Sequence, residues 1–595
     1  MSHAHLYAYI QLGDSNRKSA LCLAAKKLGQ LVPLNEGQPV LFPLQGTKKL
    51  GSPVLFRKPD GKLGLAAADH DGSEYIFVYD CGEDWTFVNE RYIRVNASGI
   101  PVRDLSVSYD KEFQIYRLMW SDGTDGYMAA TEDWEQFSEP AGSDYTKSRS
   151  DITVEEAVQA SRIAISDLEY AAFLRRYNKP HNAGITEVFP DLAAPSGSSL
   201  QQLGLPGQVT ATYSDGSVKK LAVTWDATGV DFDKPGTYPL TGRIRQPQYP
   251  NPFIRERADP YIIHDAESGY YYFTASYPTY GHDGNNEVQP DGYDRIVIRR
   301  ARTIEGLASA EETEVWNEEN SSVNHRYIWA PELHNIQGKW YILCTAGVSV
   351  DNVWSIRPIF IPCHGDVMDP AAWSRDGHWA VNETNDGSFG TFSLDMTYFE
   401  HRGTHYVIWA EKPAGSRLYM ATIDPGQPWR LTSRRIELST PDYAWEQAHG
   451  DQIDEGPAVI KQAGRILVFF SAGTVDANYC MGYLHADEDA DLMNLDSWTK
   501  HPYPVLSTCD FSDGQQGPGH NSFTVDELGN AVLCYHARTE GEPGDGGLND
   551  PGRHARVKSV HFAHDARPIL HMRAEDELHP AYADIAFSVK IMEAE

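Results

Sequence analysis

The sequence predicts an all-β protein built mainly from radially repeated four-stranded units, and three observations support this. A glycine followed by an apolar, aromatic-rich run occurs five times between Gly269 and Gly529, at intervals of 61 to 69 residues. Aromatic residues make up 11% of the chain, and its 49 glycines and 35 prolines favour many short strands joined by tight turns. The intervals suit propeller blades better than a doubly wound fold. We therefore expect a five-bladed β-propeller over residues 251–595.

Residues 1–142 carry weaker copies of the same pattern. GKLGLAAAD begins at Gly61, FQIYRLMWSDG ends at Gly123, and two acidic-tryptophan turns, DWTF and DWEQF, occur between and after them. These features predict two or three propeller-type blades, which are too few to close a ring. We expect a partial propeller-like β accessory domain without catalytic function.

Residues 143–182 are predicted to form a helical connector. Thr153 and Glu156 have the spacing of a capping box, and apolar residues then recur at helical intervals as far as Ala172. One amphipathic helix is expected over Asp151–Tyr177. Its apolar stripe indicates packing against the preceding blades.

Residues 183–250 form a separate β segment that resembles a bacterial immunoglobulin-like module. The resemblance rests on Trp225 in VTWD and on the late GTY turn at Gly236. Modules of this kind are usually spacers or docking domains. The proline-rich stretch RQPQYPNPF, from Arg245 to Phe253, is expected to lead into the propeller.

Charge and cysteine content limit the partners and the compartment. A net charge of −32 opposes binding to nucleic acid or to an anionic membrane surface, whereas a neutral glycan fits. The seven cysteines are widely spaced, without a CxxC pair, so neither a disulfide framework nor a zinc site is indicated. The sequence shows no run of about 18 apolar residues and no secretory signal, so we expect a cytoplasmic protein without a membrane span. A chain trimmed of its signal would look the same, and would be secreted.

An ionisable residue precedes each of the five repeated glycines. These residues are Asp259 in RADPYI, Glu332 in APELH, Asp395 in SLDMTYF, Glu455 in DEGPAV and His520 in GPGHNSF. If each lies on the innermost strand of its blade, the five side chains converge at the propeller axis. Cleavage of a glycosidic bond needs one carboxylic acid and one carboxylate in a single pocket, and three converging carboxyl groups can supply both.

With these motifs, residues 251–595 resemble glycoside hydrolase family 43, the five-bladed propeller arabinofuranosidases, xylosidases and arabinanases. The resemblance implies that Asp259 is the general base, that Asp395 orients the acid and tunes its pKa, and that Glu455 is the general acid. It also implies an inverting mechanism. Asp454 is a rival for the acid, but Gly456 and Pro457 complete the family's EGP motif after Glu455.

Supporting site residues are predicted with less specific signals. In many family members the histidine that corresponds to His520 points into the axial channel and ligates a calcium ion or an ordered water, so a structural calcium is possible there. Glu332 is a candidate pocket residue, although it could merely pair with a basic neighbour. Tryptophans can pack on the C–H faces of sugars, and arginine can bind hydroxyl groups. The candidates for substrate binding are Trp329, Trp354 and Trp445, with Arg553 in PGRHARV favoured over Arg538 in YHAR.

The expected function is that of an inverting, exo-acting α-L-arabinofuranosidase that releases terminal arabinose from arabinan or arabinoxylan oligosaccharides, with no cofactor for the chemistry. The preference for arabinose rests on resemblance in the YHAR and GRHARV segments. β-Xylosidase and β-D-galactofuranosidase activities are alternatives within the same family. A non-catalytic carbohydrate-binding propeller is a further alternative, but it has no need of all three carboxyl groups. A propeller for protein interaction predicts apolar or variable axial residues instead.

Overall fold

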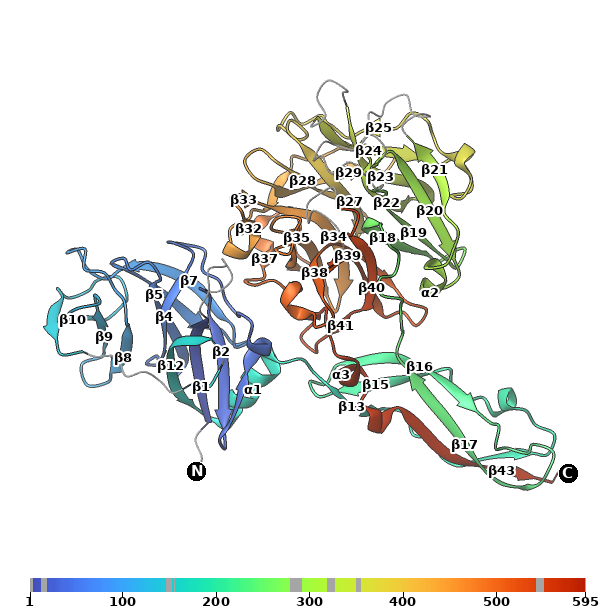
Figure 1. The fold of residues 1–595 in the computed structure, drawn as a ribbon, viewed down its shortest axis with the longest axis horizontal. Helices are drawn as coiled ribbons and strands as arrows, with labels where there is room; N and C mark the ends of the chain where they lie inside the picture. Colours follow the sequence, from blue (N-terminus) through green and yellow to red (C-terminus); the bar gives the residue numbers. More distant parts are fainter. Residues whose placement is uncertain are drawn as a thin grey trace. The chain divides into compact units, whose positions relative to one another are not determined.

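The computed structural model describes residues 4–11, 19–145, 152–154, 156–278, 292–317, 327–348, 355–541 and 550–593. The chain divides into two compact units, Met1–Lys179 with Pro441–Gly450, and Pro180–Thr440 with Asp451–Glu595. Strands dominate both units, which confirms the predicted all-β class (Figure 1). The longest helix in the described ranges has 11 residues, and no helix there is long and apolar enough to cross a membrane.

Five sheets of the second unit form the propeller, antiparallel except for the parallel pair β26 and β30 in the third sheet, and their innermost strands close into a ring. Around that ring, β18 contacts β22, β22 contacts β27, β27 contacts β34, β34 contacts β38, and β38 contacts β18 again. Innermost strand first, the sheets are β18 (Ala258–Asp265), β19 (Tyr270–Ser276), β20 (Arg295–Ala301), β21 (Thr313–Asn317); β22 (Trp329–Ile336), β23 (Lys339–Gly347), β24 (Ile356–Pro362), β25 (His378–Trp379); β27 (Ser393–His401), β28 (Thr404–Glu411), β29 (Arg417–Asp424), β30 (Gln427–Leu431), β26 (Val381–Asn382), with β31 (Ile436–Ser439) beside β29; β34 (Asp454–Gln462), β35 (Arg465–Ala472), β36 (Cys480–Asp487), β37 (Thr499–Lys500); and β38 (Gln515–Val525), β39 (Ala531–Thr539), β40 (His554–Ser559).

The repeated glycines lie in the turns that join the first two strands of each sheet. Gly269, Gly338, Gly403, Gly464 and Gly529 all have φ between 67° and 83°. This left-handed conformation carries no steric penalty for glycine, which explains why glycine marks each repeat.

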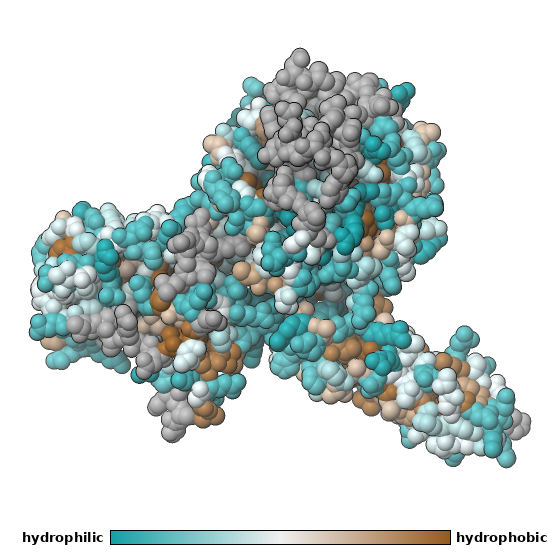
Figure 2. Space-filling model, viewed as in Figure 1, coloured by the Kyte–Doolittle hydropathy of each residue, from teal (hydrophilic) through white to brown (hydrophobic). Residues whose placement is uncertain are grey.

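Apolar side chains fill the space between neighbouring sheets. Trp316 and Ile342 are fully buried between the first two sheets, and Trp409 lies in a cluster between the second and third. Burial of side chains of this kind contributes roughly 1.5–3 kcal/mol each. The visible face of the molecule is mainly hydrophilic (Figure 2), as the net charge of −32 predicts.

The first unit contains three four-stranded sheets, as expected for a partial propeller. Innermost strand first, they are β12 (Ala157–Ile165), β1 (Ala4–Gln11), β2 (Cys22–Lys27), β3 (Gln30–Pro33); β4 (Leu50–Arg57), β5 (Leu63–Asp69), β6 (Tyr75–Cys81), β7 (Phe87–Arg94); and β8 (Ser106–Asp110), β9 (Ile115–Ser121), β10 (Gly126–Thr131), β11 (Ala141–Ser143). Strand β4 contacts both β12 and β8. Strand β12 therefore completes a blade that begins near the amino terminus.

The expected helix over Asp151–Tyr177 is wrong in its first half. Ala157–Ile165 is strand β12, which pairs antiparallel with β1, and helix α1 spans only Asp167–Tyr177. The capping box is formed by Ser166 and Glu169, whose side chains each accept a hydrogen bond from the other's backbone N–H. Pairing with a strand more than 140 residues away outweighed the local helical pattern.

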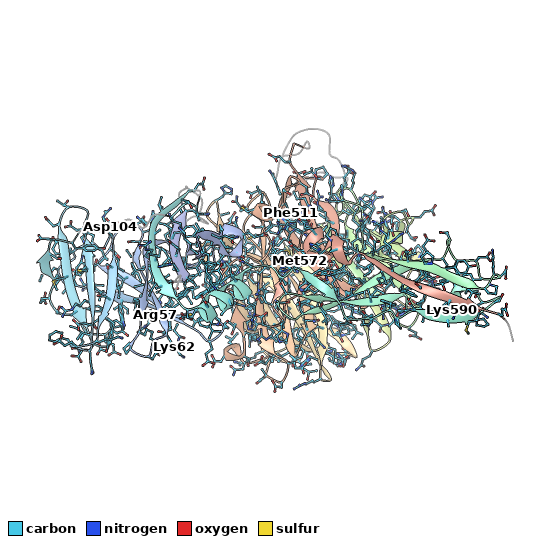
Figure 3. All side chains as sticks on the ribbon, turned by 90° about the horizontal axis from the view of Figure 1, so that it is seen from below. Arg57, Lys62, Asp104, Phe511, Met572 and Lys590 are labelled. Carbon is cyan, nitrogen blue, oxygen red and sulfur yellow. The ribbon has the colours of Figure 1, made fainter. Side chains whose placement is uncertain are left out.

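The immunoglobulin-like segment is a six-stranded sheet that includes the last strand of the chain. In sheet order its strands are β13 (Asn182–Ile185), β15 (Gln208–Tyr213), β16 (Val218–Asp226), β17 (Gly236–Arg245), β43 (Asp584–Met592) and β14 (Leu192–Pro195). Lys590, labelled in Figure 3, pairs with Thr237 of β17 and Ala193 of β14. The carboxyl-terminal strand, expected in the propeller, thus belongs to this sheet. Trp225 packs edge-on against Phe587 of that strand.

The remaining elements are short. They are helices α2 (Ile304–Leu307) and α3 (Ala574–Glu577), and the two-residue strands β32 (Gln447–Ala448), β33 (Asp451–Gln452), β41 (His561–Phe562) and β42 (Pro568–Ile569).

Candidate active site

Each innermost strand of the propeller contains a β-bulge, and in β18, β27 and β38 the residue at the bulge is ionisable. The strand register shifts at the bulge in β18, β22, β27, β34 and β38. A residue with positive φ lies at each bulge, namely Asp259, Ala330, Asp395, Gly456 and His520. Bulges re-aim side chains and bend strands, and Asp and His tolerate positive φ better than most residues.

Asp259 is buried among cationic and hydrogen-bonding groups. Ser276 Oγ donates a hydrogen bond to Asp259 Oδ2 at 2.6 Å. Arg553 Nη1 and His520 Nδ1 each lie 3.4 Å from Asp259 Oδ1. Burial alone would raise the pKa of Asp259, but the charges of His520 and Arg553 and the nearby His536 hold it far below its usual value. Asp259 is therefore an ionised carboxylate, as a general base must be.

Two neighbours fix the charge state around Asp259. Arg553 is only 3% exposed and donates from Nη2 to the hydroxyl of Tyr293 at 2.7 Å. His536 Nδ1 accepts a hydrogen bond from the backbone N–H of Asp259 at 3.2 Å. Burial lowers the pKa of His536 to about 3, so this imidazole is neutral and Arg553 and His520 carry the positive charge.

Asp395 and Glu455 form the second half of the site. Asp395 Oδ2 accepts a hydrogen bond at 3.1 Å from the backbone N–H of Gly456, the residue that follows Glu455. Burial, together with the charges of Glu455 and Asp259, raises the pKa of Asp395 to about 7 against the opposing effect of His520. Asp395 therefore retains a proton up to near-neutral pH.

The two carboxyl oxygens of Glu455 differ in their contacts. The hydroxyl of Tyr479 donates to Glu455 Oε1 at 2.9 Å. Among the described residues, the ionic neighbour of Oε2 is Lys412, whose ammonium lies 3.9 Å away. Oε1 thus already accepts a hydrogen bond, whereas Oε2 is the oxygen more open to a ligand.

Glycines of the GPGH and EGP motifs make room for these side chains. A Cβ on Gly519 would lie 2.2 Å from Cε1 of Tyr479, and a Cβ on Gly456 would lie 3.3 Å from Nδ1 of His520. The first contact is far inside van der Waals range. Gly519 therefore allows the Tyr479 ring to reach Glu455.

The three carboxyl groups open into one cavity of about 270 Å³. This volume lies near the lower end of the range for small-molecule sites, roughly 300–1,000 Å³. Among the residues that the structure describes, the lining consists of Asp259, Trp329, Phe392, Leu394, Asp395, Lys412, Ile453, Glu455, Val475, Tyr479, His520 and Arg553. Apolar surface for sugar C–H groups thus faces charged groups that can bind hydroxyls.

The structure places most, but not all, of the predicted residues at this cavity. Asp259, Asp395, Glu455, His520, Trp329 and Arg553 line it. Glu332 is not among the described lining residues, and its Oε2 lies 2.6 Å from Nε2 of His334. Trp354 lies outside the described residues.

Two residues weighed at the sequence level lie elsewhere. Trp445 and Arg538 are not among the described lining residues, and Arg538 instead donates to Asp550 at 2.9 Å. The choice of Arg553 over Arg538 therefore agrees with the geometry.

Four polar or aromatic residues of the site were not predicted from the sequence. Phe392, Lys412 and Tyr479 line the cavity, and the hydroxyl of Tyr293 accepts a hydrogen bond from Arg553. All four lie outside the innermost strands, so the five-fold pattern that revealed the carboxyl groups did not mark them.

The residues around His520 do not fit a calcium site. Within the described ranges, no group of three or more His, Cys, Asp or Glu side chains is arranged to hold a metal ion. The carboxylates of Asp259, Asp395, Glu455 and Glu332 raise the pKa of His520 although burial opposes this. A protonated imidazole supplies positive charge but no lone pair, and calcium prefers oxygen ligands.

Comparison with known proteins identifies two regions of the chain. The model of glycosyl hydrolases family 43 matches residues 249–568, more than half of the chain. The model of the bacterial Ig-like domain, group 4, matches residues 194–247.

Individual relatives align with the same half of the chain. An extracellular exo-α-(1→5)-L-arabinofuranosidase of Streptomyces avermitilis is 39% identical over 337 residues, covering 56% of this chain and 65% of that protein. A protein of the same name from Streptomyces chartreusis is 41% identical over 300 residues, covering 49% and 84%. The crystal structure of an α-L-arabinofuranosidase from Lactobacillus brevis is 38% identical and covers 55% of this chain and 97% of its own, with a TM-score of 0.48. The chain thus spans just under two thirds of the Streptomyces avermitilis protein.

These relatives correct one expectation and establish the family. The cytoplasmic assignment is wrong, because both Streptomyces proteins are named extracellular. The amino-terminal residues of the sequence were not a sound basis for assigning a compartment. The family model and the alignment over most of the Streptomyces chartreusis protein lead to one conclusion. The chain belongs to glycosyl hydrolases family 43.

Proposed function

We propose that this protein is an inverting, exo-acting α-L-arabinofuranosidase that removes terminal arabinose from arabinan or arabinoxylan oligosaccharides outside the cell. The observation that carries the proposal is the division of charge in one small cavity. Asp259 is held ionised by His520 and Arg553, whereas Asp395 retains a proton up to near-neutral pH. A base and an acid therefore coexist at the same pH.

The reaction follows from this division. Asp259 takes a proton from water as the water oxygen attacks the anomeric carbon. The bond from that carbon to the leaving oxygen breaks on the opposite face, and the electron pair of that bond accepts the proton from Glu455 Oε2. Because attack and departure occur on opposite faces, the product has the inverted configuration. Solvent then removes the proton from Asp259 and returns one to Glu455.

Asp395, Tyr479 and Arg553 hold this arrangement in place. Asp395 binds the N–H that follows Glu455, and Tyr479 binds Glu455 Oε1, so the acid is restrained at its backbone and at its carboxyl group. Arg553 keeps Asp259 ionised and lines the cavity.

Arabinose and an exo mode are proposed on two grounds. The relatives described above are named arabinofuranosidases, and both Streptomyces proteins are named exo-acting on α-(1→5) linkages. A cavity of about 270 Å³ suits one terminal sugar rather than the interior of a polymer. β-Xylosidase and β-D-galactofuranosidase activities remain the alternatives, since they use the same acid and base.

The test is hydrolysis of 4-nitrophenyl α-L-arabinofuranoside, β-D-xylopyranoside and β-D-galactofuranoside, together with α-1,5-arabinobiose, with the first-formed anomer followed by proton NMR. We expect the arabinosides to be cleaved fastest and the β-anomer of arabinose to appear first. First appearance of the α-anomer would overturn inversion. No hydrolysis of any substrate would favour a non-catalytic carbohydrate-binding propeller.

A further inference from the structure

One charged side chain in the cavity has no part in the mechanism above. Lys412 follows strand β28, and its ammonium lies 3.9 Å from Glu455 Oε2 and 5.1 Å from the centre of the Phe392 ring. At 3.9 Å the contact with Glu455 is electrostatic and is too long for a hydrogen bond, so it does not occupy an N–H group. The side chain is 36% exposed and lines the cavity, where it can meet a ligand.

Hydrogen bonds fix the part of the cavity lining that consists of Phe392 and Lys412. The backbone N–H of Lys412 donates to the carbonyl of Phe392 at 2.9 Å. The preceding residue, Glu411, is 1% exposed and accepts hydrogen bonds at 3.1 Å from the N–H of Phe389 and at 3.2 Å from the N–H of Thr391. Its Oε2 also accepts from Arg435 at 2.7 Å. A buried carboxylate thus fixes the short segment that presents Phe392 beside Lys412.

The position of Lys412 and Phe392 relative to the acid and the base determines which part of a substrate they can bind. The cations Arg553 and His520 lie at Asp259, on the side of the attacking water. Lys412 lies instead at Oε2 of Glu455, the oxygen that protonates the leaving group. A ligand group near Lys412 therefore belongs to the sugar that departs, not to the sugar that is attacked.

We propose that Lys412 and Phe392 form the subsite for the leaving-group sugar, in which Phe392 packs against ring C–H groups and Lys412 donates to a hydroxyl or ring oxygen. The ligand class is a neutral sugar on the far side of the scissile bond. This inference rests on the proposed function and adds the part of the substrate that the acid side recognises. Aromatic stacking combined with a charge-assisted hydrogen bond is the usual chemistry of sugar recognition.

The experiment compares Lys412→Met with Lys339→Met on two substrates. Lys339 is a matched control because its ammonium also lies near an aromatic ring, 5.3 Å from the centre of Tyr341, but does not line the described cavity. For Lys412→Met we expect kcat/KM on α-1,5-arabinobiose to fall by about 10-fold, mainly through KM, and by a smaller factor on the 4-nitrophenyl arabinoside, which has no leaving-group sugar. Lys339→Met should match the wild type.

Each outcome is decisive. Equal losses on both substrates, or an unchanged value on arabinobiose, would overturn the subsite. Phe392→Leu provides a second variant, and it should also lower activity on arabinobiose more than on the aryl substrate. Melting temperatures within about 2 °C of the wild type show that folding is intact. Absence of activity in the wild type on both substrates would instead refute the proposed function itself, so the two failures are distinguishable.

Discussion

Gly519→Ala tests whether the hydrogen bond from Tyr479 orients the acid. Gly519 has no positive φ, so alanine suits its backbone and the effect of the substitution is steric. The added Cβ would lie 2.2 Å from Cε1 and 2.3 Å from Cδ1 of Tyr479, and 3.2 Å from Oγ of Ser471. Carbon atoms in contact are separated by about 3.5 Å, so the ring must move by roughly 1.3 Å.

A displacement of that size breaks the 2.9 Å hydrogen bond to Glu455 Oε1. A hydrogen bond to a neutral carboxylic acid contributes about 0.5–1.5 kcal/mol, which corresponds to a loss of roughly 2- to 13-fold in kcat/KM. The assay is steady-state hydrolysis of α-1,5-arabinobiose, whose poor leaving group depends on the acid. Overpacking should also cost about 1–3 kcal/mol of stability, measured by urea unfolding.

Two variants separate these effects. Tyr479→Phe removes the hydroxyl without crowding, so its activity should fall by a similar factor whereas its stability changes little. Gly207→Ala adds a Cβ that meets no atom within 4 Å and should match the wild type in both measurements. If Gly519→Ala keeps more than half of the wild-type kcat/KM, the orienting role of Tyr479 is refuted.

Three further predictions follow from the charges. Arg553→Met removes a cation 3.4 Å from Asp259, so the pKa of that carboxyl should rise. The acid limb of the pH profile of kcat/KM should then move to higher pH, and an acid limb that stays in place contradicts the prediction. The pKa of Asp395 is about 7 in the folded protein against about 3.9 when unfolded, so the folded state binds the proton more tightly and this group's contribution to stability falls as pH rises from about 4 to 7. Asp395→Asn should therefore gain in Tm relative to the wild type over that range, and a constant difference in Tm argues against this. Lys219→Met leaves the buried carboxylate of Glu577, 2.8 Å away, without its ion-pair partner. The free energy of unfolding, measured in urea, should fall by about 3–5 kcal/mol while kcat stays unchanged. An unaltered urea midpoint would count against a stabilising role of the pair.

Periodicity explains why the carboxyl groups could be predicted and the residues around them could not. Asp259, Asp395 and Glu455 lie at or next to the bulge on the innermost strands of three blades, 8 to 10 residues before a turn glycine, so their spacing from that glycine revealed them. Lys412 and Tyr479 reach the cavity from other parts of their blades. No repeat marks such positions, and only the folded geometry brings them to the acid.

Non-local pairing accounts for the errors in the element assignment. The residues of Ala157–Ile165 fit a helical pattern in isolation, but their pairing with β1 depends on sequence more than 140 residues away. Strand β43 likewise joins β17 and β14 after the whole propeller has intervened. Local propensity does not register either contact, whereas the Ser166 and Glu169 capping box was a local signal that could have placed the start of α1.

The first unit shows that the bulge is a device for placing a side chain and is not itself a mark of catalysis. Strand β4 has the same register shift, between Gly51 and Val54, and Ser52 at the bulge has φ of 45°. There the N–H of Ser52 donates to Gln159 at 2.7 Å, and its hydroxyl accepts from the N–H of Leu105 at 3.0 Å. A neutral hydroxyl at this position links neighbouring segments and has no proton to exchange near neutral pH. In the propeller the same backbone geometry presents carboxyl groups and an imidazole, and it is their mutual electrostatics that separates a base from an acid.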